Sequence, residues 1–197
     1  MFMTQHSGAE NLKFYQGIHA GYENYYFIRP PMTVAEGNYA FRSNLFVELP
    51  LAEDTRLILS GLYSPFTHGP LFELILTESF FSYGFGVKQR LGPDWLCYGR
   101  HQRWLIINNV SPGTLRREVI YYEAALAQVA APWQWGLKAS WMQYFNGPGG
   151  ISATQTFYWG PLVAYEQPLL GPFYFSVELS WMWAAGPHTY FSVSVPF

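Results

Sequence analysis

The chain has 197 residues, of which 50% are hydrophobic, 20% are aromatic and only 12% are charged. Because a soluble domain typically carries about 25% charged residues, this composition is too poor in charge for a solvated globule. The formal net charge of −2 comes without a basic or acidic block, which argues against nucleic acid as a partner, and the single cysteine, Cys97, excludes an internal disulfide or a cysteine-based metal cluster.

Residues 1–12 are polar and small, and we expect them to form a loose leader. They lack a basic stretch followed by an apolar one, so we expect no export signal within them. If the protein is exported, the signal has been removed from this sequence.

From Lys13 onward the apolar residues recur at every second position, which is typical of two-faced β-strands. No apolar run reaches about 18 residues, so a membrane-spanning helix is excluded. Ten strands are predicted, and eight or twelve are the alternatives. They span residues 13–28, 38–51, 56–63, 81–90, 95–108, 117–129, 133–145, 156–165, 173–183 and 190–197.

Turn-forming residues separate these segments, as in Leu91-Gly92-Pro93-Asp94, Ala131-Pro132 and Gly186-Pro187-His188. The connection of residues 64–80 is the longest, and its segment 71–76 fits either a strand extension or one or two helical turns. In Arg100-His101-Gln102-Arg103 the two arginines fall on opposite faces of one strand. A bulge there, or a strand end above a membrane, would accommodate the second arginine.

The last strand reads Y-F-S-V-S-V-P-F and places Phe191, Val193, Val195 and Phe197 on one face. With the alternating strands upstream, this ending resembles the terminal strand of bacterial outer-membrane β-barrel proteins, and those four residues would then form an insertion signal. Pro196 departs from the pattern because proline removes one ladder donor. The resemblance covers most of the chain as architecture and identifies no particular member.

The resemblance implies an all-β, antiparallel, up-and-down transmembrane barrel over residues 13–197, in the outer membrane of a Gram-negative bacterium. The large apolar face of each strand would point outward into lipid. The implied partners are the lipid bilayer, lipopolysaccharide and the barrel-assembly machinery. The even strand number, with short connections after every second strand, fits periplasmic turns opposite extracellular loops.

In such a barrel the polar faces would line the lumen with almost equal numbers of acidic and basic groups. We expect a lumen charge network of His19, Glu23, Arg42, Glu48, Arg56, Lys88, Arg90, Glu123, Lys138, Glu166 and Glu178. One interpretation is a plug of ion pairs, which gives the protein a structural role. The other is a narrow, porin-like water path with weak ion selectivity.

An enzyme is the main alternative, since some small outer-membrane barrels are acyl hydrolases or acyltransferases. The sequence contains no G-x-S-x-G, H-E-x-x-H or phosphate-loop motif, and only His6 in the leader lies within two residues of a serine. Cross-strand pairing of His19 or His101 with a serine is left open. We predict no catalytic residue, no metal and no cofactor, and we keep a lipid-binding or lipid-modifying barrel, acting through residues 64–80, as the alternative function.

Tryptophans near strand ends or on the apolar faces predict an aromatic girdle at the lipid head groups. They are Trp95, Trp133, Trp135, Trp159, Trp181 and Trp183. A soluble sandwich, or a soluble lipid-binding barrel, would instead bury these faces.

Overall fold

The computed structural model describes residues 18–28, 39–65, 67–68, 74–76, 78–108, 110, 114–146, 152–168, 174–183 and 186–196. All of the regular structure in these residues is β-strand. The strands are β1 (His19–Ile28), β2 (Tyr39–Ala52), β3 (Thr55–Ser64), β4 (Thr67–His68), β5 (Leu74–Ile75), β6 (Glu78–Arg90), β7 (Trp95–Asn108), β8 (Thr114–Ala130), β9 (Trp133–Asn146), β10 (Ser152–Pro168), β11 (Tyr174–Met182) and β12 (Gly186–Pro196).

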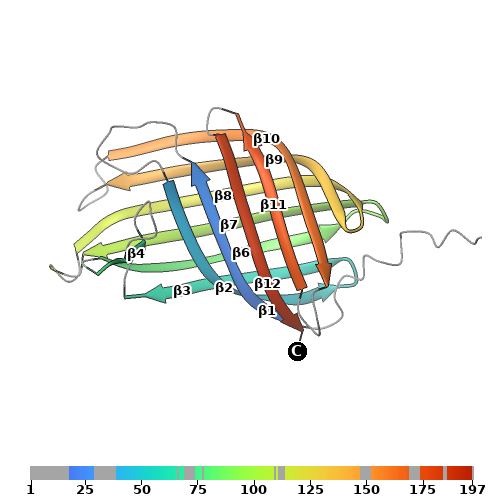
Figure 1. The fold of residues 1–197 in the computed structure, drawn as a ribbon, viewed down its shortest axis with the longest axis horizontal. Coiled ribbons are helices and arrows are strands. Elements are labelled where there is room, and N and C mark those ends of the chain that lie inside the picture. The colour runs from blue at the N-terminus through green and yellow to red at the C-terminus, as the bar shows by residue number, and fades with distance from the viewer. Residues whose placement is uncertain are drawn as a thin grey trace, which may run out of the picture.

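Ten of these strands close into one antiparallel barrel in the order β1-β12-β11-β10-β9-β8-β7-β6-β3-β2 (Figure 1). Strand β1 pairs with β2 on one side and with β12 on the other, so the first and last barrel strands close the sheet. The prediction of a ten-stranded, up-and-down, antiparallel barrel is confirmed. In the described part of the chain, no helix is long and apolar enough to cross a membrane.

The strand boundaries agree with the alternating pattern to within a few residues, and β7 spans residues 95–108 as predicted. The prediction that Gly186-Pro187-His188 forms the last turn is wrong, because β12 begins at Gly186. A proline is tolerated at the start of a strand, where the ladder loses little from its missing donor. The turn at residues 91–94 is as expected, and Gly92 adopts a φ of 74° that favours glycine.

The two ends of the barrel differ in their connections. At one end, which we call the turn end, the connections are residues 53–54, 91–94, 131–132 and 169–173. At the other, the loop end, they are residues 29–38, 65–77, 109–113, 147–151 and 183–185. Within residues 65–77, β4 pairs with β5, so the described part of this connection contains a small hairpin and not the helical turns that were one of its two interpretations.

Alternate residues face opposite sides of the wall. Leu137, Phe157 and Trp181 on the outer face are 60%, 62% and 61% exposed, whereas Glu23, Asn44 and Gln102 on the inner face are at most 1% exposed. The six tryptophans of the predicted girdle are all exposed on the outside. The Trp-rich faces therefore do not turn inward, as a soluble sandwich or a soluble lipid-binding barrel would require.

The two arginines of β7 lie on opposite faces without a bulge between them, because the pairing of β7 with β6 and β8 runs unbroken from residue 96 to residue 106. The bulge that was one explanation for Arg103 is therefore absent, and the register shift of β7 lies at Ile106/Ile107. Arg103 points outward, where Nε lies 2.5 Å from Oε1 of Glu118 and Nη1 donates to the Tyr83 hydroxyl at 2.9 Å.

Candidate functional site

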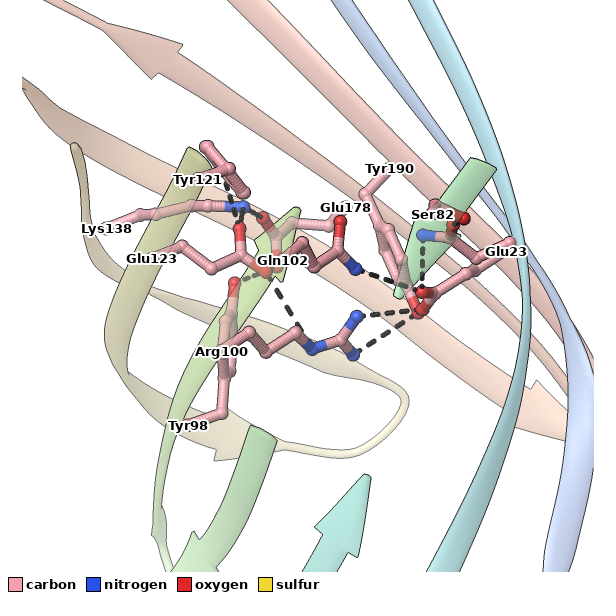
Figure 2. Close-up of polar contacts among 11 residues, drawn as sticks. Glu23, Ser82, Tyr98, Arg100, Gln102, Tyr121, Glu123, Lys138, Glu178 and Tyr190 are labelled. Atoms are coloured by element: carbon pink, nitrogen blue, oxygen red, sulfur yellow. Dashed lines mark hydrogen bonds and ion pairs between the residues drawn. The ribbon is translucent and has the colours of Figure 1, made fainter. Parts of the chain in front are cut away.

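A connected group of polar side chains crosses the middle of the lumen (Figure 2). Three glutamates, Glu23 from β1, Glu123 from β8 and Glu178 from β11, are 0%, 5% and 6% exposed. Two cations lie among them, Arg100 from β7 and Lys138 from β9. Buried carboxylates are tolerated only when they are paired and hydrogen-bonded, so the partners of each glutamate decide whether this site is stable.

The carboxylate of Glu23 on β1 is bound by side chains from three other strands. Its Oε2 lies 2.9 Å from Nη1 of Arg100 and accepts a hydrogen bond from the Tyr190 hydroxyl at 3.1 Å. Its Oε1 accepts from the amides of Asn44 and Gln102, both at 3.2 Å. These contacts tie β1 to β2, β7 and β12 across the lumen.

Glu123 and Glu178 share Lys138. Nζ of this lysine lies 2.6 Å from an oxygen of each carboxylate, and its side chain is only 3% exposed. A tyrosine hydroxyl donates to each glutamate as well, Tyr121 to Glu123 at 2.8 Å and Tyr98 to Glu178 at 2.5 Å. Arg100 also approaches Glu123, with Nε 3.7 Å from Oε1, so each of the three glutamates has at least one cation and one tyrosine as partners.

A second group of charges lies nearer the turn end. Arg56 of β3 is 2% exposed, and its Nε lies 3.0 Å from Oε2 of Glu48 on β2. Nζ of Lys88 lies 3.8 Å from Oε2 of Glu166, which also accepts a hydrogen bond from the Gln134 amide at 3.0 Å. A cavity of about 60 Å³ lies between this group and the central one, which is room for only a few water molecules.

Toward the loop end the lumen becomes apolar. One cluster of buried side chains comes from β6, β7, β8, β9 and β10, with Tyr190 of β12 packed against it. Its members are Phe80, Trp104, Ile106, Val119, Tyr121, Met142 and Tyr158. Trp104 stacks on Tyr121 with ring centroids 5.3 Å apart. The cross-section is thus occupied by ion pairs in the middle and by aromatic and aliphatic side chains beyond them.

The remaining residues of the predicted charge network are placed as follows. His19 is 1% exposed and stands opposite Glu48 in the β1–β2 register. Arg90 is half-buried at the end of β6. The side chain of Arg42 lies outside the described part of the chain, as do the side chain of Phe191 and all of Phe197. Val193 and Val195 are half-buried and alternate with the buried Ser192 and Ser194.

Sequence reasoning missed Arg100, which lies at the centre of the network. The pattern allowed either arginine of β7 to face inward, and neither was assigned to the lumen. The position of Trp95 could have decided between them. If Trp95 faces outward, the alternation of side chains along β7 places Arg100 and Gln102 inside. The tyrosine partners and the apolar cluster at the loop end were also missed, since both come from residues that are common on either face of a barrel.

The register does not place a serine directly opposite either candidate catalytic histidine. His101 stands opposite Phe85 and Tyr122, and His19 stands opposite Glu48 and Pro196. Among the described residues, no group of three or more His, Cys, Asp or Glu side chains is arranged to hold a metal ion. The described polar side chains of the lumen are joined by ion pairs and hydrogen bonds.

No protein-family model matches the sequence, and no curated protein matches it either. Among solved structures, the fold is similar to the crystal structure of Ail, the attachment invasion locus protein of Yersinia pestis. The two chains are 12% identical, with a TM-score of 0.32, and the alignment covers 91% of this chain and 95% of Ail.

Proposed function

We propose that the protein is an integral outer-membrane β-barrel with a closed lumen, whose role is structural. It spans the lipid bilayer, displays the connections of its loop end on one side of the membrane, and conducts neither ions nor solutes. The assembly machinery and lipopolysaccharide of a Gram-negative outer membrane are its expected partners.

The height of the apolar outer belt supports the membrane placement. On β8, the outward side chains between Gln128 and Glu118 are all uncharged, namely Leu126, Ala124, Tyr122 and Ile120. These ten residue steps cover about 33 Å along the strand, which at a tilt of about 40° is about 25 Å along the barrel axis. Transmembrane barrels present an apolar band of about this height to lipid.

The buried network carries the proposal of a closed lumen. Its side chains come from β1, β2, β6, β7, β8, β9, β11 and β12, so they reach across the lumen from most of the wall. The apolar cluster at the loop end adds a second layer that consists mostly of apolar side-chain surface. A permeant ion would have to break several buried ion pairs, which is costly where water is scarce.

Single-channel recording in a planar bilayer tests this proposal. The wild-type barrel, shown to be folded by heat-modifiable gel mobility, is expected to produce no conductance steps. The double variant Arg100→Ala/Trp104→Ala removes the centre of the network and the largest side chain of the apolar cluster, and discrete steps are expected from it. Steady steps from the wild type would instead establish a narrow channel through the lumen.

A further inference from the structure

The outer surface of the wall from β6 to β10 carries an apolar groove of about 540 Å³, which lies within the range of ligand pockets. Its floor consists of Gly99 on β7, Ala124 on β8 and Ala139 on β9, which stand side by side in the strand register. None of these side chains is larger than a methyl group. The floor of the groove therefore lies close to the strand backbone, whereas the larger side chains around it project further outward.

An aromatic row forms the wall of the groove toward the loop end. Its members occupy directly opposed positions on β6, β7, β8, β9 and β10, and they are Phe85, His101, Tyr122, Trp141 and Phe157. Neighbouring ring centroids lie 5.2 Å apart for Phe85 and His101, 4.6 Å for His101 and Tyr122, and 5.2 Å for Tyr122 and Trp141. On the turn side, Leu126 and Leu137 stand 46% and 60% exposed next to the floor.

The next row toward the loop end is polar except for Ile120 on β8. Its other members are Tyr83, Arg103, Gln143 and Gln155, again in register across the strands. In the ion pair of Arg103 with Glu118, the arginine side chain is 39% exposed and the glutamate only 12%, so the pair presents its cation outward. This row lies where an apolar belt gives way to head groups, and its exposed charge complements a phosphate.

The groove also runs obliquely to the barrel axis. The row of residues that forms the floor continues to Val87 on β6 and to Trp159 on β10. Val87 lies three residues before the turn-side end of β6, whereas Trp159 lies nine residues before the turn-side end of β10. The β6 end of the groove therefore lies nearer the turn end of the barrel than the β10 end does. An elongated apolar ligand fits this course.

We propose that this groove binds one acyl chain of a phospholipid, with the phosphate at Arg103. The inference rests on the membrane placement proposed above, and the groove is continuous with the apolar belt that would face lipid. A second copy of the chain is a poorer occupant, because a two-fold interface would set one hollow against another and leave a void.

Native mass spectrometry tests the proposal. The protein is reconstituted in phosphatidylglycerol nanodiscs and then released from them by activation. The wild type is expected to retain one phosphatidylglycerol molecule when the other lipids have been stripped. In Ala124→Leu the added side chain fills the floor, and retention should fall about tenfold, which corresponds to about two displaced methylene groups.

Ala20→Leu is the matched control. It makes the same substitution on the outer face of β1, on the opposite side of the barrel, and should retain lipid as the wild type does. Gly99→Leu is a second groove variant, because a Cβ at Gly99 meets only the Glu123 carbonyl oxygen at 3.8 Å and so causes no clash.

Equal retention in the wild type and both groove variants, or no retained lipid in the wild type, would overturn the proposal. A mass of two chains that disappears in Ala124→Leu would do so as well and would assign the groove to an interface between copies. A wild-type chain that fails to enter nanodiscs would refute the membrane placement itself, which separates that failure from a failure of the lipid site.

Discussion

Replacing Lys138 by leucine is expected to destabilise the barrel by about 3–5 kcal/mol, the usual cost of removing one partner from a buried ion pair. The lysine is the shared cation of Glu123 and Glu178, at 2.6 Å from each, so its loss leaves two buried carboxylates without their closest positive charge. The free energy of unfolding in urea, measured in lipid vesicles, checks this. A further exchange of Glu178 for glutamine in the Lys138→Leu variant should recover part of the loss.

Trp135→Leu is the control for the opposite face of the same strand. Trp135 is 44% exposed on the outside of β9, and leucine keeps an apolar side chain at that position. Its indole N–H donates to the side-chain oxygen of Gln128 over a long 3.3 Å. We expect a cost below about 1 kcal/mol. If Trp135→Leu proved more damaging than Lys138→Leu, the assignment of inner and outer faces would be wrong.

Adding a single methyl group at Gly136 should also be severe. This glycine faces inward on β9, and a Cβ there would lie 2.0 Å from the Leu126 carbonyl oxygen and 2.6 Å from the Ala127 Cα. Both atoms belong to the backbone of β8, so relief requires the two paired strands to separate. We expect Gly136→Ala to cost at least about 3 kcal/mol, the upper end for overpacking, in the same urea measurement.

Gly99→Ala serves as the matched control, because the same change on the outer face meets only the Glu123 carbonyl oxygen at 3.8 Å. Its free energy of unfolding should stay within about 1 kcal/mol of the wild-type value, since alanine also restricts the unfolded chain. A Gly136→Ala variant as stable as Gly99→Ala would show that β8 and β9 are not packed as closely as described.

The alternation of side chains was readable from the sequence because it is a local property. In a strand, successive residues face opposite sides whatever the strand pairs with. The faces of β8 and β9 follow from this rule, as does the placement of Glu123 and Lys138 inside the barrel. The low charge and the Trp-rich faces likewise indicated that the apolar side points outward, before any contact was known.

Only the tertiary structure decided which charges meet. Lys138 and Glu178 are 40 residues apart, and Glu23 and Arg100 are 77 residues apart, so their contacts depend on the register of several strands at once. That register is set by closure of the barrel between β1 and β12, and no single strand contains it. The apolar cluster at the loop end and the outer groove arise in the same way, since each combines rows of residues from five strands. Local periodicity thus determined the two faces of the wall, whereas barrel closure determined the contacts that fill the lumen and shape its outer surface.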